Sequence, residues 1–514
     1  MSDAMRRAVL IFGVLAILVG IGIADGTTGG SAATGSSAGG ALSSVSASTA
    51  ATAASGTSVT PTGAESSAWF CAGSTGNGGN AGATMIITNP SPRAVTGTVT
   101  TVSTVGTVGT VVPMTVPVPA KTQLAVTPAA PTAPTTTATA TATASTTTAG
   151  PGESTEASTV VFSGGGVGVT QVVNGPLGFS QAPCASKTAR HWYFADGSTA
   201  TGDTLSLSLF NPTDTVSVVN VTFVSSTGVL APPAYQGIDI PGGSLVTENI
   251  GDHVLNNPDV ATEVAALSGQ VVASELESAG PAGSGGPSVV LGATAPSRQW
   301  SFAQNTEVSN GSTVFHIFNP STRTARVTVK IGLQQGAAEP LVLRVPGQSV
   351  STLDTKRLTR IPVDTPFAVT FEAGGGAGIV VDRHGAAPAG TASPGAGAPD
   401  VGDVAGVPGG ARRWLVPGEY APVTGVTALA VVDLNSEAVS VKLMTVSANG
   451  LVPVPGFGVR RVRSGLPLVV SPATGSPIGT VPLEIVASGP VAVEVDAGPA
   501  GSPGVIVTPA LPLG

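Results

Sequence analysis

Apolar and polar residues alternate along most of the chain in short runs, such as VSVVNVTFV at 216–224 and ARVTVKIGL at 325–333. Alternation with a period of two places one face of a β-strand on a core. The runs are interrupted by many of the 69 Gly and 42 Pro residues, which mark turns. Strong helix formers are scarce beside Val and Thr, which favour strands. The pattern predicts an all-β fold.

The alternating pattern belongs to a longer unit that occurs four times. Each copy begins with a similar stretch around one of the four tryptophans: WFCAGSTG, WYFADGST, WSFAQNTE and WLVPGEYA. These tryptophans are Trp69, Trp192, Trp300 and Trp414. We expect each indole to fill the centre of a core that is poor in other aromatic residues.

Two further landmarks follow every tryptophan. An apolar strand ends in a turn that begins 19 or 20 residues later, at Asn89, Asn211, Asn319 and Asp433. Asn or Asp starts such a turn because its side chain can bond its own backbone. A later strand ends at a proline, which removes a ladder donor: Pro119, Pro241, Pro346 and Pro455.

About 110 residues with seven or eight short strands match the size of an immunoglobulin-like β-sandwich. We therefore predict four tandem sandwich repeats, at 66–187, 188–296, 297–411 and 412–514. The alternative is a β-propeller-like assembly, although a propeller blade is shorter. Repeat 1 carries a Thr/Pro-rich stretch at 127–158, which predicts a disordered surface loop, and 385–411 reads as a shorter Gly/Pro/Ala loop.

The N-terminus predicts export. Arg6 and Arg7 precede an apolar run at 8–24, which is just long enough to cross a bilayer. Positive charge on the N-terminal side keeps the N-terminus in the cytoplasm, so 1–24 reads as a single-pass signal anchor with the bulk of the chain outside. The alternative is a signal peptide cleaved near Ala24, which gives a secreted protein. Residues 25–65, rich in Gly, Ser, Ala and Thr, predict a disordered linker.

Composition narrows the class of partner. Charged residues are only 10% of the chain and the net charge is −8, with basic residues scattered. Phosphate binding needs a basic face, so we expect no nucleic-acid partner. The densest basic run, Arg460, Arg461 and Arg463, reads as an exposed strand edge.

The two cysteines lie at opposite ends of repeat 1. Cys71 follows the first tryptophan and Cys184 ends the same repeat. In an exported chain this placement predicts a disulfide between them.

A search for chemistry finds no catalytic motif. The histidines at 191, 253, 316 and 384 have no metal-ligand spacing, so we expect no metal, cofactor or catalytic residue. His316 reads as an ordinary strand residue, and Asp382-Arg383-His384 as a charged hairpin end. Asp196-Gly197 reads as a turn, so we expect Asp196→Ala to cost under about 1 kcal/mol.

WYFADGST with LFNP, the N-terminal anchor and the cysteine pair resemble a family of exported, membrane-anchored actinobacterial proteins of unknown function. The resemblance implies a location and no reaction. Our leading hypothesis is a non-enzymatic cell-envelope scaffold or interaction module, whose partner is an envelope polysaccharide or protein. The alternatives are an array of carbohydrate-binding modules and an envelope hydrolase without a recognisable motif. The sequence does not determine the oligomeric state.

Overall fold

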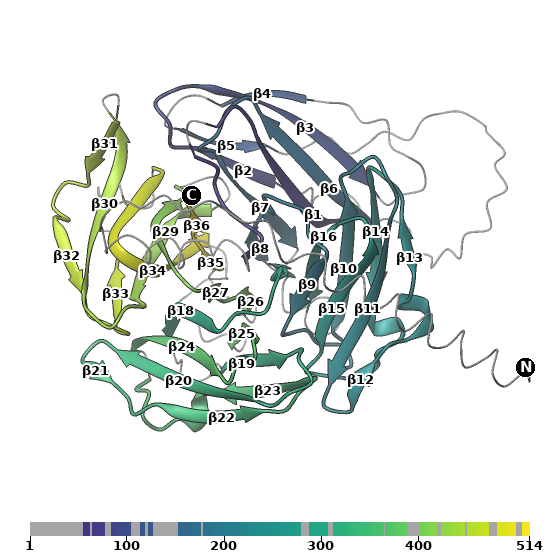
Figure 1. Ribbon diagram of the computed structural model, residues 1–514. Helices are drawn as coiled ribbons and strands as arrows, with labels where there is room; N and C mark the ends of the chain where they lie inside the picture. Colours follow the sequence, from purple (N-terminus) through teal and green to yellow (C-terminus); the bar gives the residue numbers. More distant parts are fainter. Residues whose placement is uncertain are drawn as a thin grey trace, which may run out of the picture. The chain divides into compact units, whose positions relative to one another are not determined.

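The computed structural model describes residues 55–61, 64–77, 84–103, 114–118, 122–126, 153–175, 178–278, 287–306, 312–363, 365–387, 400–418, 423–447, 450–471, 478, 481–499 and 506–513. Strands dominate this part of the chain, which confirms the all-β class (Figure 1). None of the helices in these ranges is long and apolar enough to cross a bilayer. The predicted anchor at 8–24 and the N-terminal part of the linker lie outside the described residues.

The strands fall into four consecutive groups along the chain. Strand group one contains β1 (Ser67–Asn77), β2 (Thr84–Asn89), β3 (Val95–Ser103), β4 (Met114–Val118), β5 (Thr122–Val126), β6 (Glu153–Phe162), β7 (Gly168–Gly175) and β8 (Gly178–Pro183). Strand group two contains β9 (His191–Phe194), β10 (Thr204–Asn211), β11 (Ser217–Ser225), β12 (Gly228–Leu230), η1 (Pro233–Tyr235), β13 (Ile238–Ile240), β14 (Ser244–Asn249), η2 (Ile250–Asp252), β15 (Ala261–Ser268), β16 (Val272–Ser278) and β17 (Pro287–Leu291).

The second half of the chain continues in the same way. Strand group three contains β18 (Gln299–Thr306), β19 (Ser312–Asn319), β20 (Ala325–Leu333), β21 (Gly336–Ala337), β22 (Leu341–Val345), β23 (Ser349–Asp354), η4 (Thr355–Arg357), β24 (Pro366–Gly374), β25 (Val380–Ala387), β26 (Asp400–Ala405) and β27 (Val407–Pro408). Strand group four contains β28 (Ala411–Val416), β29 (Val423–Asp433), β30 (Val439–Ser447), β31 (Gly450–Pro453), β32 (Val459–Val462), β33 (Pro467–Val470), β34 (Leu483–Pro499), β35 (Ile506–Pro509) and β36 (Leu511–Pro512).

One pairing order recurs in all four groups. In group two, a tryptophan sheet has the order β12-β11-β15-β9, and a closing sheet has the order β14-β10-β16-β17. Groups one and three repeat this order, with closing sheets β5-β2-β7-β8 and β23-β19-β25-β26. In group four the long strand β34 takes part in both sheets, pairing with β28 and β30 through its first half and with β29 and β35 through its second.

The two kinds of sheet are buried differently. Strand β11 of a tryptophan sheet shows the predicted alternation of buried and partly exposed residues. Strands β16 and β17 of the adjoining closing sheet are buried along nearly their whole length. A strand buried at consecutive positions is covered on both faces. Strands β16 and β17 therefore lie in the interior, and their polar residues are held away from water, whereas β14 at the other edge of the sheet is partly exposed.

The four tryptophans occupy equivalent positions in the cores. Each is at most 2% exposed. Their indole N–H groups donate to the carbonyls of Val167, Val271, Ile379 and Val491, at distances of 3.1, 2.9, 2.6 and 3.1 Å. Each indole thus joins the two sheets of its group with the one polar group that a buried tryptophan must satisfy.

The recurrent asparagines hold the turns together. Asn211 is fully buried, and its Nδ2 donates to the carbonyls of Thr215 and Ile240 at 2.7 and 2.9 Å. Its Oδ1 accepts from the backbone N–H and the hydroxyl of Thr213. Asn89 and Asn319 make the same set of bonds in their groups.

The prolines of the third landmark follow the strand ends to which these asparagines bond. Ile240 and Val345 accept from the asparagines and directly precede Pro241 and Pro346. Pro455 follows Val454 in group four, whereas Pro119 lies outside the described residues. Group four departs at its turn, because Asp433 cannot donate, and its Oδ1 accepts from Asn435 while its Oδ2 has no hydrogen-bond partner.

The predicted disulfide is present. Cys71 in β1 is bonded to Cys184, which directly follows β8, with their Cα atoms 4.6 Å apart. The bond joins the first strand of group one to the segment that leaves its last strand. Beside it, Phe70 and Ala185 exchange two backbone hydrogen bonds of 2.8 Å.

Three predicted loops are shorter than the sequence indicated. The linker 25–65 does not extend to residue 65, because Val59 is buried and its N–H donates to the carbonyl of Pro512 at 2.9 Å. The insertion 127–158 loses its last residues to β6, which begins at Glu153. The loop at 385–411 contains β26 and β27. In each case backbone pairing overrides a composition that is typical of loops.

The last strands of the closing sheets connect the groups. Contacts run from β8 to β17, from β17 to β26, from β26 to β35 and from β35 back to β8. Two serines on these strands repeat one contact: Ser180 accepts the N–H of Val289 at 2.9 Å, and Ser288 accepts the N–H of Asp403 at 2.8 Å. The four groups are therefore joined through buried edges.

Candidate functional site

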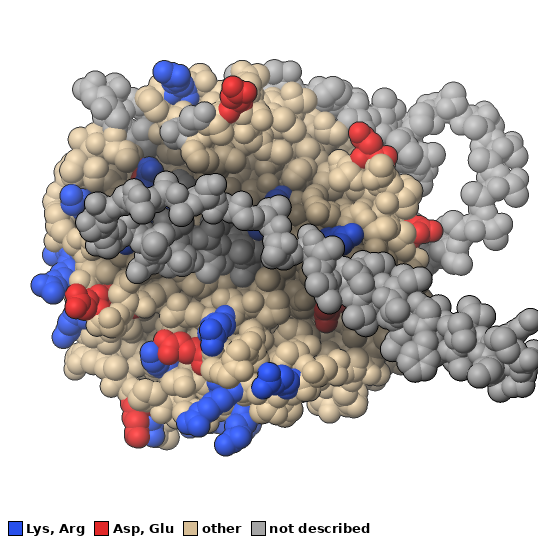
Figure 2. Space-filling model, in the orientation of Figure 1, with Lys and Arg blue, Asp and Glu red and all other residues tan. Residues whose placement is uncertain are grey.

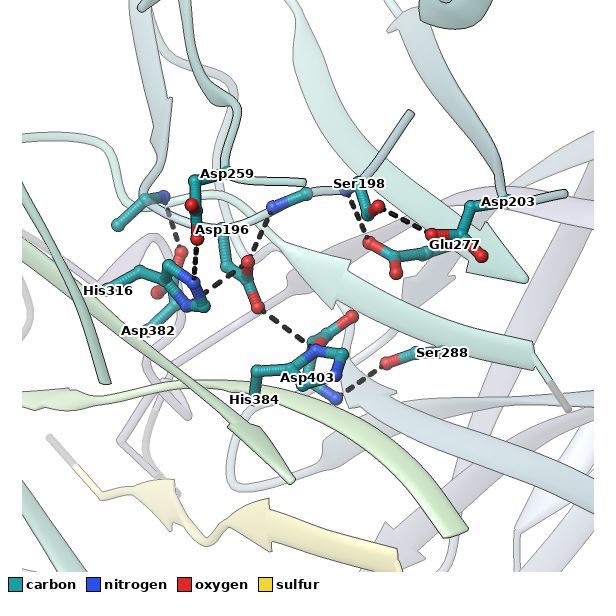
Figure 3. A network of polar contacts seen from close by, with 12 residues as sticks. Asp196, Ser198, Asp203, Asp259, Glu277, Ser288, His316, Asp382, His384 and Asp403 are labelled. Carbon is teal, nitrogen blue, oxygen red and sulfur yellow. Dashed lines mark hydrogen bonds and ion pairs between the residues drawn. The ribbon is translucent and has the colours of Figure 1, made fainter. Parts of the chain in front are cut away.

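Ionisable side chains gather in the interior between strand groups two and three (Figure 3). Group two contributes Asp196, Asp259, Glu275 and Glu277, and group three contributes His316, Asp382, His384 and Asp403. Apart from Asp259 and His384, these residues are less than 9% exposed. Buried charges at this density are rare unless they are paired, so the cluster is the strongest candidate for a functional site.

Asp196 lies at the centre of the cluster, in the irregular segment between β9 and β10. Its Oδ1 accepts the N–H of Gly197 at 2.8 Å. Gly197 packs closely on the core, because an added Cβ would lie 2.7 Å from a methyl group of Leu205 and 3.2 Å from the carbonyl oxygen of Val260. The segment is thereby pressed against the core, and the Asp196 carboxylate points at group three. The interpretation of Asp196-Gly197 as only a turn is wrong.

His316 in β19 lies between two carboxylates. Its Nδ1 is 3.1 Å from Asp196 Oδ1, and its Nε2 is 2.9 Å from Asp259 Oδ1. The prediction of an ordinary strand residue is wrong, because the side chain is 5% exposed and joins two segments of group two to group three.

His384 in β25 forms the other side of the cluster. Its Nδ1 is 2.6 Å from Asp403 Oδ1 and 3.3 Å from Asp196 Oδ2. Asp382, Arg383 and His384 lie within a strand that pairs with β19 on one side and β26 on the other. The prediction of a charged hairpin end is therefore wrong. Asp382 instead accepts the N–H of Ala195 at 2.5 Å, across the boundary between the groups.

A small cavity lies beside Asp196. It is lined by the side chains of Asp196, Glu275, Glu277, Asp382 and Asp403, together with Leu205, Ser288 and Val290. About 10 Å³ is open to the centre of a water-sized sphere, which is room for about one water. Glu277 accepts the N–H of Ser198 at 2.9 Å through Oε2, while its Oε1 has no hydrogen-bond partner.

Burial and charge divide the carboxyl groups into two kinds. Burial raises the pKa of Glu275 and of Glu277 well above the ordinary range, and it raises the pKa of Asp382 to about 7. Burial acts on Asp196 in the same direction, but His316 and His384 outweigh it and hold the pKa of Asp196 well below its usual range. Asp196 therefore stays ionised although it is buried.

The imidazoles respond in the opposite way. Burial would lower the pKa of His316, but Asp196 and Asp259 raise it to about 10. Asp403 and Asp196 likewise raise the pKa of His384 well above its usual range, against the effect of burial. Without another cation, the two imidazolium groups supply the charge that keeps Asp196 ionised in the interior.

A second buried ion pair joins groups three and four. Arg383 lies 3.8 Å from Glu494 Oε2 and donates to Asn305 Oδ1 at 2.8 Å. Glu494 also accepts the N–H of Gln304 at 2.7 Å. Glu494 thus bonds a backbone N–H four residues after the tryptophan of the preceding group, and Asp382 likewise bonds Ala195, three residues after Trp192.

A larger cavity is lined mainly by β8, β17, β26 and β35 and by the segments that follow these strands. Ser55, Thr57, Trp300 and Trp414 complete its lining. Its volume is about 50 Å³ by the same measure, far below the several hundred Å³ of a pocket for a sugar or a drug-sized ligand. Asp403 lines both cavities, so the ionic cluster borders this space.

One face of the molecule carries little charge. On the face drawn in Figure 2, Lys, Arg, Asp and Glu stand singly or in small groups among uncharged residues. Arg460 and Arg461 are exposed on β32, as predicted, and Arg460 lies over the ring of Phe457.

The residues singled out from the sequence and those of the cluster are different sets. The tryptophans predicted from the sequence pack in the core of their own group, the asparagines hold its turn, and the cysteines form the disulfide of group one. The cluster was missed because its members come from separate strands. One signal was present: DRH at 382–384 places three ionisable residues in an otherwise apolar strand pattern.

The fold and cluster define an all-β, disulfide-bonded protein with a buried ionic site between two of its strand groups. The chain belongs to a family of unknown function, DUF5719, whose model matches residues 135–455. The matched segment includes every residue of the cluster. The family carries no assigned activity.

Other comparisons add no functional assignment. No curated protein matches the chain. The crystal structure of Thermotoga maritima 1070 is similar at 15% identity over 22% of this chain and 93% of that one, with a TM-score of 0.18. A tetra-tandem repeat from the extending region of a large adhesion protein is similar at 10% identity over 86% and 99%, with a TM-score of 0.10. Scores this low support no argument about fold or function.

Proposed function

We propose that this chain is a non-catalytic extracytoplasmic protein of the cell envelope, which acts as a scaffold or interaction module. It is built from four immunoglobulin-like β-sandwiches, at 66–187, 188–296, 297–411 and 412–514. The recurrent pairing of a tryptophan sheet with a closing sheet supports this subdivision. The residues at 8–24 anchor the chain in the membrane as a single-pass segment, or are removed by cleavage near Ala24.

The observation that carries the proposal is that the last strands of the four closing sheets, β8, β17, β26 and β35, join the four strand groups. Contacts between β8, β17, β26 and β35 and the ion pairs between groups tie the repeats to one another. A body of this kind presents its tryptophan sheets outward at fixed positions, which suits a scaffold. Its partner is an envelope polysaccharide or an envelope protein.

The disulfide supports an extracytoplasmic location. Stable disulfides form in oxidising compartments and are rare in the cytosol. The bond between Cys71 and Cys184 closes a loop with a sequence separation of 113 residues and is part of the core of group one. A chain that remained in the cytosol would have to fold group one without it.

The alternative of a carbohydrate-binding module array is less well supported. Such modules stack sugars on exposed aromatic platforms, but all four tryptophans are buried and bonded through their indole N–H groups. The alternative of a hydrolase needs a substrate to reach catalytic groups. The ionic cluster borders cavities with room for a few waters.

The function is tested with the full-length chain and separated envelope polysaccharide and protein fractions. We expect saturable binding to one of the two fractions, no turnover of peptidoglycan or polysaccharide, and unchanged tryptophan fluorescence. Turnover of any of these substrates would contradict the non-enzymatic role. A fluorescence shift on adding polysaccharide would instead support carbohydrate-binding modules.

The location is tested by the redox state of the cysteines in living cells. The full-length chain should resist alkylation of Cys71 and Cys184 by a thiol reagent after denaturation. A matched variant that lacks residues 1–24 should stay inside the cell and react at both positions. Equal reactivity of the two chains would contradict export through the N-terminal segment.

A further inference from the structure

We propose that Asp196, His384 and Asp403 form a binding site for one divalent transition-metal cation, with Zn²⁺ as the best fit. The site lies at the junction of strand groups two and three, and its cation would tie the two groups together. The inference does not depend on the scaffold role, since a structural cation serves any protein whose repeats must stay joined.

The positions of three atoms motivate the proposal. Asp196, His384 and Asp403 each offer one ligand atom, and these atoms lie within 4.8 Å of one another. His384 Nδ1 is 3.3 Å from Asp196 Oδ2 and 2.6 Å from Asp403 Oδ1. Ligand atoms at about 2.1 Å from a tetrahedral zinc lie about 3.4 Å apart. The Asp196–His384 distance already matches this value, and the His384–Asp403 pair would have to open by about 0.8 Å to seat the ion.

An unpartnered oxygen gives a second, independent observation. Asp196 Oδ2 is buried and has no hydrogen-bond partner, although it lies close to His384. A single proton on Nδ1 can be donated along one direction, and Asp403 takes it at 2.6 Å. A cation in place of that proton would bind all three ligand atoms, Asp196 Oδ2, His384 Nδ1 and Asp403 Oδ1, at once.

Neighbouring residues orient the proposed ligands Asp196 and Asp403, as outer-shell residues do in known metal sites. Asp196 is oriented through its other oxygen, Oδ1, by the N–H of Gly197 and by His316, which is in turn held by Asp259. The backbone of Asp403 is fixed by Ser288. Carboxylate–histidine relays of this kind orient ligands and raise their basicity.

Ligand type and number decide the choice of metal. One imidazole with two carboxylates suits Zn²⁺ and its first-row neighbours. Calcium takes six to eight ligands that are all oxygen, whereas one of the three ligand atoms here is an imidazole nitrogen. The adjoining cavity, with room for about one water, provides the fourth ligand. The His384 side chain is 22% exposed, which gives the ion a route from solvent.

The site also explains why its ligands come from two groups. Asp196 follows the tryptophan strand of group two, whereas His384 and Asp403 lie on the adjacent strands β25 and β26 of group three. A cation bound to all three crosslinks the groups without a covalent bond. We therefore expect a bound metal to raise the midpoint of thermal unfolding in a concentration-dependent way.

The test uses the full-length chain, stripped with a chelator and titrated with Zn²⁺ by isothermal calorimetry. We expect one Zn²⁺ per chain. His384→Gln and Asp403→Asn should each weaken binding by at least about 100-fold, and the outer-shell variant His316→Gln by about 10- to 100-fold. The matched control is His191→Gln, because His191 is 49% exposed and lies outside the cluster. It should bind as the wild type does.

Co²⁺ gives a readout that does not depend on any variant. The wild-type chain should bind Co²⁺ with the visible absorption of a four-coordinate nitrogen- and oxygen-ligated ion, and Zn²⁺ should abolish the signal while Ca²⁺ does not. Failure of the folded wild type to bind either Zn²⁺ or Co²⁺ stoichiometrically overturns the proposal. Equal Zn²⁺ affinity of the wild type, His384→Gln and Asp403→Asn overturns it as well.

Discussion

Asn211 allows the account of the recurrent turn to be tested by exchanging one amide nitrogen for oxygen. In Asn211→Asp the side chain keeps its volume and still accepts from Thr213. It can no longer donate to the carbonyls of Thr215 and Ile240, which lie 2.7 and 2.9 Å away. A carboxylate oxygen would instead face two carbonyl oxygens in a fully buried position.

The cost follows from these contacts. Two lost hydrogen bonds contribute about 1 kcal/mol each, and leaving the buried acceptors unpaired adds about 1 to 3 kcal/mol. We expect about 3 to 5 kcal/mol for the opening of group two, which corresponds to a fall in amide protection of about two to four decades. Native-state hydrogen exchange of the amides in β10 and β14 measures this directly.

The reverse exchange in group four is the control. Asp433 occupies the equivalent turn, and its Oδ2 has no hydrogen-bond partner to lose. Asp433→Asn should therefore change protection in β29 by less than about tenfold. Our account of the turn would be refuted if Asn211→Asp kept its protection within tenfold, or if Asp433→Asn caused an equal loss.

Other substitutions test the core, the cluster and the covalent link. Trp192→Ala should lower the free energy of unfolding by about 3 to 5 kcal/mol in chemical denaturation, and a loss under about 1 kcal/mol would mean that the indole is not central. Asp196→Ala should cost a similar amount, well above the value expected for a turn, because it leaves two buried imidazolium groups without their shared carboxylate; a small effect would contradict the ionic network. Cys71→Ser should lower the free energy of unfolding by about 4 kcal/mol relative to the oxidised wild type. Its thermal midpoint should lie below that of the oxidised wild type and equal that of the reduced wild type, so equal midpoints of the variant and the oxidised wild type would count against the prediction. Arg383→Gln should destabilise the fold by about 3 to 5 kcal/mol, because it leaves the buried carboxylate of Glu494 without its partner. Adding Glu494→Gln should recover part of the loss, and no recovery would mean that the two side chains are not coupled.

The sequence predicted those features of the fold that depend on local pattern. Trp192 has an equivalent in every strand group because each group buries one indole. Asn211 has equivalents in groups one and three because those turns use the same amide, while group four has Asp433. The disulfide followed from the placement of two cysteines in one repeat. Strand alternation was correct for β11, whose one face meets water, and uninformative for β16, which is buried on both sides.

The cluster was beyond the reach of local pattern. Asp196, His316 and Asp403 come from three distant segments, and only the packing of group two against group three brings them together. The loop boundaries failed for a related reason. Glu153 and Val59 lie in stretches whose composition is typical of loops, but each pairs with a strand that is remote in sequence.

The pairing of Val59 with Leu513 places a constraint on the order in which the chain can assemble. During synthesis from the N-terminus, residue 59 emerges long before Leu513. The segment at 55–61 can first bond group one, because Gly56 and Thr60 accept from the N–H groups of Ser186 and Gly166, and only its bonds to group four have to wait. Until Leu513 is available, groups one and four cannot be joined through this pairing. Group one can therefore form its own contacts with this segment before the bonds between Val59 and group four close.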